Sequence, residues 1–150
     1  VVDFTHKKPL EGITPQDLEA AVARSAGDWA AGDAIVIWTG HSKNYERPDY
    51  TTYRPFITAD GATWLAERRP RFGFVVTDLI GLDDPADLEN LVHLRLLSGD
   101  LPFVQVTTNL NRLAEGEWYI AAFPIKLIDG TGSSLRAHRI PSSDRNSYTF

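Results

Sequence analysis

The chain has 150 residues, 43% hydrophobic and 23% charged, and its 15 basic and 20 acidic residues give a net charge of −5. This is ordinary globular usage on a length that suits one domain with its own core, so residues 1–150 are expected to form a single domain. The absence of cysteine excludes disulfides and thiol catalysis, no basic patch is long enough to bind nucleic acid, and the apolar runs are too short to span a membrane.

Methionine is also absent, and the chain begins at Val1. Because a translated chain begins with methionine, residues 1–150 are expected to be a processed product or a piece of a longer chain. No signal peptide is present, and a cytoplasmic location is the expectation.

The chain opens with a predicted strand at residues 1–6, where β-branched and aromatic residues alternate with polar ones. Residues 12–29 then predict a helix, with Thr14 as its N-cap and Pro15 at its first position. Asp17, three residues after the N-cap, completes a variant of the capping box. These signals place the start of the first helix.

Gly27 is the expected end of that helix. Residues 32–40 follow with a continuous apolar run, which is typical of a strand buried on both faces. Residues 41–56 form a long polar and aromatic loop, and loops of this length are usually functional or mobile. Residues 58–70 predict a short helix.

Residues 71–83 predict a second buried strand. The helix expected next covers residues 84–99, with Pro85 at its first position and either Asp83 or Asp84 as its N-cap. Its core stripe is expected to consist of Leu88, Leu91, Val92 and Leu96.

The last predicted elements are all strands. A third buried strand is expected at residues 102–110, one or two strands at 117–128, a turn at 129–134 and a final strand at 135–140. The order β-α-β-α-β-α-β-β-β predicts an α/β or α+β domain around a mixed sheet.

His41 directly follows the strand predicted at residues 32–40 and opens the aromatic loop. Ligands usually bind at the ends of strands in α/β sheets. His41 is therefore either part of a binding pocket or a plain surface residue. The other histidines include His6 and His138, which are expected at strand ends in surface roles.

Two polar residues interrupt apolar patterns further along the chain. His93 lies beside the apolar stripe of its helix, and Gln105 lies in the middle of the next strand. A helix and the strand after it run back to back, so the two side chains can face each other. Each is either a hydrogen-bonded core residue or a ligand, because imidazole nitrogen and amide oxygen both bind divalent metals. A catalytic metal needs at least three protein ligands, and no motif supplies a third.

Six blocks of the sequence carry a family resemblance: VVDFTHKKPLEGITPQDLEAA, GDAIVIWTGHSKNY, FITADGATWLAE, FVVTDLIGLDDP, HLRLLSGDLPFVQVTTNL and FPIKLIDGTGSSLRA. Together, in this order, they resemble the C-terminal part of the cyclase-like metal hydrolases, which include bacterial kynurenine formamidase, isatin hydrolase and proteins named polyketide cyclases. The blocks cover nearly all of residues 1–139. The resemblance implies an α/β, mixed-sheet domain of the swivelling β/β/α type, flanked by helices and incomplete without an N-terminal segment.

The resemblance also implies ligands. In that family a histidine of an HxxLL block and an acidic or amide residue twelve positions on bind a metal, which here implies His93 and Gln105 and a zinc or manganese ion. Gln105 resembles the isatin hydrolases rather than the formamidases, which have glutamate. A neutral ligand leaves more positive charge on the metal, which makes it a better Lewis acid for its water.

Substrate contacts are implied for Tyr45, Tyr50 and His41, which would shape an aromatic pocket. The family usually has tryptophan at the position of His41, so the resemblance does not imply which substrate is preferred.

The family's main signature, an N-terminal HxGTHxDxPxH block, does not occur in residues 1–150. That block supplies two histidines and an aspartate to the metal and the histidine that handles protons, so no catalytic residue is assigned within this chain. Three explanations are open: a precursor was cleaved, a second polypeptide carries the block, or the chain is a degenerate relative without a metal. A homo-oligomer is also implied by the resemblance.

The implied function is hydrolysis of an amide, cyclic amide, ester or lactone bond of a small aromatic substrate by metal-activated water. The alternative is a non-catalytic structural or binding subunit that keeps the fold. No nucleic-acid or membrane partner is expected.

Overall fold

The computed structural model describes residues 1–25, 29–113 and 118–141. The chain divides into two compact units, Val1–Asn111 and Arg112–Phe150. In chain order, the elements that lie wholly in the first unit are β1 (Val2–Asp3), β2 (Gly12–Ile13), α1 (Pro15–Arg24), β3 (Asp33–Trp38), η1 (His41–Asn44), β4 (Phe56–Ile57), α2 (Ala59–Ala66), β5 (Phe72–Thr77), α3 (Leu91–Ser98) and β6 (Phe103–Val104). A short 3₁₀ helix, η2 (Leu110–Leu113), follows β6.

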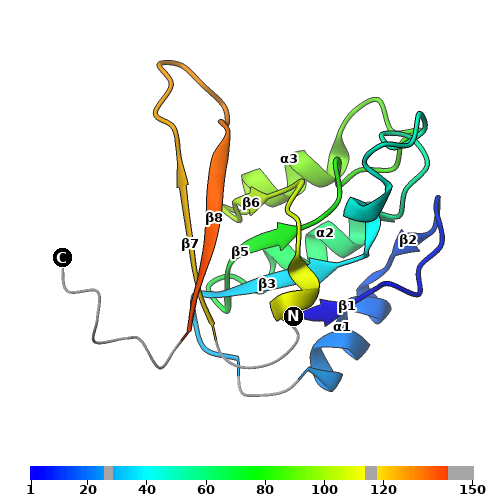
Figure 1. Cartoon of the computed structure of the whole chain (residues 1–150). Helices are drawn as coiled ribbons and strands as arrows, with labels where there is room; N and C mark the ends of the chain where they lie inside the picture. The colour runs from blue at the N-terminus through cyan, green and yellow to red at the C-terminus, as the bar shows by residue number, and fades with distance from the viewer. Residues whose placement is uncertain (26–28, 114–117, 142–150) are drawn as a thin grey trace. The chain divides into compact units, whose positions relative to one another are not determined.

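A four-stranded parallel sheet organises the first unit (Figure 1). Its strand order is β1-β3-β5-β6, and every pairing in it is parallel. Helices connect the strands. Parallel pairing requires such connections, because the chain must return to the starting edge of the sheet before the next strand can run in the same direction. The expected α/β class is confirmed. In the described residues, however, parallel and antiparallel pairing occur in separate sheets and not in one mixed sheet, because the antiparallel pair forms a two-stranded sheet of its own in the second unit.

The main core lies where the three helices meet one face of this sheet. Ile35, Ile37 and Val75 alternate toward that face from β3 and β5, and all three are fully buried. The helices contribute Leu18 from α1, Leu65 from α2 and Leu96 from α3 to the same cluster. Because the helices pack on the sheet through apolar side chains, the polar loops remain at the ends of the strands.

The first helix begins as the sequence predicts. Thr14 Oγ1 accepts a hydrogen bond from the backbone N–H of Asp17 at 3.2 Å, and an Asp17 carboxylate oxygen accepts one from the N–H of Thr14 at 2.8 Å. This reciprocal capping box is therefore confirmed. The helix ends at Arg24, and its expected stop at Gly27 lies outside the described residues. Helix α2 is likewise capped by its threonine, Thr58.

The helix predicted at residues 84–99 is shorter than expected. It begins at Leu91, not at Pro85, and Leu88, predicted for the core stripe, is 92% exposed. Residues 84–90 form turns instead. The Asp84 carboxylate accepts a hydrogen bond from the N–H of Ala86, and the Asp87 carboxylate accepts one from the N–H of Glu89. Short local hydrogen bonds of this kind compete with a helix, and here they win.

The strand predicted at residues 102–110 is also shorter, because β6 covers only Phe103–Val104. Val106 has a positive φ of 59°, which ends the extended conformation, and its N–H bonds to the carbonyl of Leu79 at 2.9 Å. Gln105 therefore lies at the end of the strand rather than in its middle. A second short pairing, of β2 with β4, forms a separate parallel pair that the sequence did not predict.

The second unit contains β7 (Trp118–Pro124) and β8 (Leu135–Pro141), which pair in antiparallel fashion as a two-stranded sheet. The predicted strand ends earlier than expected, at Pro124, so residues 125–134 connect the two strands, and the expected turn at 129–134 lies within this connection. The exposed His138 lies in the middle of β8, opposite Ala121, and not at a strand end. No helix in the described part of the chain is long and apolar enough to cross a membrane. That all 150 residues form one domain stays a prediction.

Candidate functional site

Asp78 ties the carboxyl ends of β3 and β5 together. Its side chain is fully buried, and Oδ1 accepts hydrogen bonds from the backbone N–H and the Oγ1–H of Thr39 at 2.9 and 2.8 Å. Oδ2 accepts from the N–H of Ser42 at 3.3 Å. A buried carboxylate is tolerated only with such partners, so this contact fixes where the loop after β3 begins. The position of His41 follows from it.

His41 lies inside this loop rather than on the surface. It is 3% exposed, and its ring stacks on Tyr50 with centroids 4.6 Å apart and planes 4° from parallel. His41 Nε2 lies 2.8 Å from the carbonyl oxygen of Tyr50, so the neutral imidazole donates from Nε2. Tyr45 packs edge-on against Tyr50 at 5.5 Å and is 70% exposed. The three residues predicted for substrate binding therefore form one cluster, in which Tyr45 is the exposed member.

Burial lowers the pKa of His41 below its ordinary value, and the nearby charge of Arg54 acts in the same direction. The hydrogen bond to the Tyr50 carbonyl and the charge of Asp78 oppose this shift without cancelling it. His41 therefore stays neutral in the folded chain under conditions in which an exposed histidine is protonated.

We expect this histidine to make folding pH-dependent. In the unfolded chain the pKa of His41 is about 6.5. Above this pH His41 is neutral in both the folded and the unfolded state, so it adds no pH dependence. Below it His41 is protonated in the unfolded state but stays neutral in the folded state, so its contribution lowers the free energy of unfolding as the pH falls from about 6.5 towards 5. Urea unfolding of the wild type and His41→Gln across this range measures the effect. The variant should lose less stability on acidification than the wild type or His6→Gln, and equal losses in all three would contradict it.

His93 is held by a buried carboxylate. Its Nδ1 forms a hydrogen bond with Asp83 Oδ2, and Asp83 is 4% exposed. The other oxygen, Asp83 Oδ1, accepts from the backbone N–H groups of Val92 and His93 at 2.7 and 3.3 Å. The His93 ring also packs edge-on against Phe103, with centroids 4.8 Å apart. Asp83 thus binds the first amides of α3 and also fixes the imidazole, but the N-cap position itself is Asn90, so the prediction of Asp83 or Asp84 as the N-cap was wrong.

Gln105 follows β6 and lies two residues after Phe103. Because side chains alternate along an extended segment, we expect Gln105 on the same side of the chain as Phe103, whose ring contacts His93. Its Oε1 is buried without a hydrogen-bond partner. A buried oxygen left unpaired costs about 1–3 kcal/mol, which calls for an explanation such as an ion or a ligand.

Arg54 links this region electrostatically to the aromatic cluster. It is 6% exposed, and its guanidinium donates to the carbonyl oxygens of Asp83 at 2.8 Å and Thr51 at 3.0 Å. Burial lowers the Arg54 pKa, while the negative charge of Asp83 raises it. Gly81 makes room for this side chain, because a Cβ there would lie 2.6 Å from Arg54 Nη2. A positive charge is thereby kept beside the buried Asp83 carboxylate.

The two predicted metal ligands have suitable free atoms. His93 makes no hydrogen bond through Nε2 within the described residues, and Gln105 offers an unpaired carbonyl oxygen. Both donors suit zinc or manganese. Within the described ranges, however, no group of three or more histidine, cysteine, aspartate or glutamate side chains could hold a metal ion. The chemistry of the pair fits a divalent metal, and a complete site needs further ligands.

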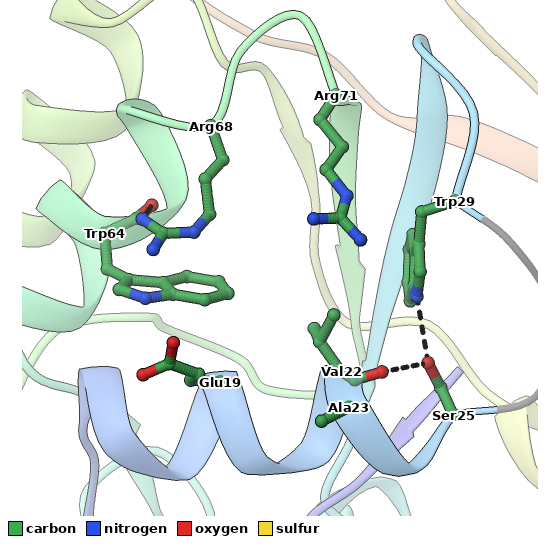
Figure 2. A pocket seen from close by; sticks show the side chains of 8 residues that line it. All are labelled: Glu19, Val22, Ala23, Ser25, Trp29, Trp64, Arg68 and Arg71. Carbon is green, nitrogen blue, oxygen red and sulfur yellow. Dashed lines mark hydrogen bonds between the residues drawn. The ribbon is translucent and has the colours of Figure 1, made fainter.

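A surface hollow elsewhere in the first unit contains none of these residues. It lies beside α1 and the C-terminal end of α2, and Trp29, Trp64, Arg68 and Arg71 face it (Figure 2). The Arg68 guanidinium lies 3.7 Å above the Trp64 ring. Arg71 immediately precedes β5, so the hollow lies toward the amino end of that strand. The site candidates cluster at the opposite, carboxyl end.

Comparison with known proteins identifies the family of this chain. The family model described as "Putative cyclase" matches residues 1–84, which is more than half of the chain. The chain belongs to this cyclase family. The match includes the His41 cluster and Asp83 of the cyclase chain, while His93 and Gln105 lie after the matched range. The resemblance inferred from the sequence blocks is confirmed.

Individual relatives of this cyclase-family chain agree with that assignment. Kynurenine formamidase of Bacillus cereus is 28% identical over 136 residues, which cover 87% of this chain and 54% of the relative. Kynurenine formamidase of Bacillus anthracis is 30% identical over 108 residues, 69% of this chain and 46% of the relative. The chain thus spans about half the length of the curated relatives it matches.

A solved relative supports the fold. Isatin hydrolase A from Ralstonia solanacearum superposes with a TM-score of 0.72 at 21% identity, over 91% of this chain and 57% of that protein. At this identity the likeness shows the fold alone. The cyclase-family chain therefore has the fold of about half of that longer protein.

Three residues of the site region were not assigned their roles from the sequence. Asp83 was considered only as a helix cap, and Asp78 and Arg54 were given no role. A signal was available for both aspartates, since each follows the apolar run of β5, at the strand end where polar groups gather. Arg54 lies in an irregular loop and gave no such signal.

Proposed function

We propose that this chain is part of a metal-dependent hydrolase that cleaves an amide, cyclic amide, ester or lactone bond of a small aromatic substrate. The observation that carries the proposal is the unpaired, buried Oε1 of Gln105, which directly follows β6, the strand whose Phe103 packs on the anchored His93. The kynurenine formamidase and isatin hydrolase relatives support the hydrolase class.

In this proposal His93 Nε2 and Gln105 Oε1 hold a zinc or manganese ion. When bound, such an ion lowers the pKa of a coordinated water and polarises a carbonyl oxygen. The chain's own residues orient the donors: Asp83 holds the imidazole by Nδ1, and Phe103 limits rotation of its ring. Gln105 adds no negative charge, so it would leave more positive charge on the metal than a glutamate at this position. No proton-transfer residue is assigned among residues 1–150.

The remaining ligands are proposed to come from outside residues 1–150, on a cleaved N-terminal segment or on a second polypeptide. Two observations support this. The described residues contain no group of three ligands of the histidine, cysteine or carboxylate type, and the chain spans about half of its curated relatives. A homo-oligomer remains part of the proposal.

The aromatic cluster is proposed to bind the substrate ring through Tyr45. Tyr45 exposes its ring, whereas His41 and Tyr50 are buried behind it and stack on each other. An exposed ring supported from behind can pack against an aromatic substrate without first being ordered. His41 and Tyr50 would then position Tyr45 rather than touch the substrate.

A non-catalytic structural or binding subunit is the second candidate. The observation that favours it is the small number of donors in the described part of the chain, since a pair alone cannot hold a catalytic metal. The two candidates differ in metal content.

Metal analysis of the purified native protein, with every polypeptide that co-purifies, tests the proposal. Intact mass and gel filtration identify the polypeptides, and elemental analysis gives the metal per chain. We expect about one zinc or manganese ion per copy of residues 1–150. A preparation of the complete assembly that hydrolyses no amide or ester and retains no stoichiometric metal would support the non-catalytic subunit instead.

A further inference from the structure

Asp83 does more than a helix cap requires. It lies in the turn after β5, nine residues before Val92, and reaches the start of α3 from a different part of the chain. A cap needs only one side-chain oxygen on the first free N–H groups. Oδ1 fulfils that role on Val92 and His93, so the contact of Oδ2 with the His93 ring is additional.

The same helix start has a second carboxylate that only caps. Asp87 accepts from the N–H of Leu91 at 2.9 Å and from the N–H of Glu89 at 2.8 Å. These contacts lower the pKa of Asp87, the bond from Leu91 most. Asp87 forms no hydrogen bond with the His93 ring, so the two aspartates separate the capping role from the contact with the imidazole.

We propose that Asp83 is the positioning residue for His93, whose imidazole it holds as the Nδ1–H tautomer with the Nε2 lone pair presented to a divalent cation. The inference deepens the proposed function and rests on it for the identity of the ligand. A carboxylate accepts hydrogen bonds and donates none, so a neutral His93 must carry its proton on Nδ1. The other nitrogen is then unprotonated, which is the form that binds metal.

The surroundings keep this arrangement rigid. Arg54 donates to the Asp83 main-chain carbonyl and places a positive charge near the buried carboxylate, which offsets the cost of its burial. The His93 side chain is 28% exposed, so its outer edge is accessible while Nδ1 is held inside. Phe103 packs edge-on against the ring and restricts its rotation. The imidazole therefore has one fixed nitrogen and one available nitrogen.

The test is Asp83→Asn, with the ¹⁵N spectrum of the His93 ring and the metal affinity as readouts. An asparagine oxygen can still accept from the helix N–H groups, but its NH₂ would then face Nδ1 and donate to it. We expect the metal-free wild type, at about pH 8, to show the Nδ1–H tautomer and the variant to show Nε2–H. Zinc affinity, measured by competition with a chelator, should fall about 10–100-fold in the variant.

Asp87→Asn is the matched control, because it changes a capping carboxylate of the same helix without touching the ring. It should keep the Nδ1–H tautomer and the wild-type zinc affinity. The proposal is overturned if the wild type shows Nε2–H, or if Asp83→Asn keeps both the tautomer and the affinity. Should Asp83→Asn not fold, the wild-type spectrum alone decides. If the wild type shows Nδ1–H but holds no metal, the positioning role stands and the proposed metal function fails.

Discussion

Replacing His93 by alanine is expected to abolish stoichiometric metal binding and to lower kcat/KM for hydrolysis at least about 100-fold in the complete assembly. Loss of one ligand from a site of three to five strongly weakens metal binding. The rate should fall with it, because metal-assisted catalysis supplies several kcal/mol of transition-state stabilisation. Elemental analysis and steady-state kinetics on one preparation measure both effects. A loss of rate with the metal retained would place His93 elsewhere in the mechanism.

The His93→Ala protein should remain folded, because the side chain is 28% exposed and is not part of the main core cluster. Leu94→Ala is the matched control, since Leu94 is 59% exposed on the same helix. It should leave the metal content and the rate unchanged. Wild-type metal content and rate in His93→Ala would contradict the assignment of this histidine.

The largest effect on stability is expected at Asp78. Asp78→Ala leaves three buried or half-buried donors, the N–H and Oγ1–H of Thr39 and the N–H of Ser42, without their acceptor. Each such donor costs about 1–3 kcal/mol, so the free energy of unfolding should fall by at least about 3 kcal/mol. Urea unfolding followed by circular dichroism measures the change.

Two other variants sharpen this result. Asp78→Asn keeps an oxygen for Thr39 and should cost less than Asp78→Ala. Asp60→Ala removes an aspartate that pairs with Arg95 at 3.3 Å and whose side chain is 85% exposed, so it should cost less than about 1 kcal/mol. Equal losses for Asp78→Ala and Asp60→Ala would show that the ends of β3 and β5 do not depend on this carboxylate.

Local signals predicted the elements that depend on local interactions. The capping box of Thr14 and Asp17 placed the start of α1, because both partners lie within one turn. The apolar runs at residues 32–40 and 71–83 predicted β3 and β5, which are buried in the centre of the sheet.

The start of α3 depends on contacts from the turns that precede the helix. Proline and acidic residues at 84–87 resemble a helix start, yet the helix amides bind Asp83 and Asp87 from turns that precede Leu91. Propensity alone gives no reason to favour these turns over a longer helix. The exposed Leu88 follows directly from this competition.

The sequence singled out the candidate site residues, whose metal-binding role stays a prediction, but it did not predict their contacts. The spacing of His93 and Gln105 singled out the pair, and the structure packs the His93 ring on Phe103, two residues before Gln105. The bond from Asp83 to the imidazole joins a loop to a helix and leaves no periodic pattern in the sequence. The stacking of His41 on Tyr50 likewise depends on the path of an irregular loop.

The most direct test of the account is anomalous diffraction at the zinc and manganese absorption edges, from crystals of the complete native assembly. If His93 and Gln105 bind the metal, we expect one strong anomalous peak per copy of the chain, within about 2.0–2.2 Å of both His93 Nε2 and Gln105 Oε1. A peak bound by other residues, or ordered His93 and Gln105 side chains with no peak beside them, would contradict it.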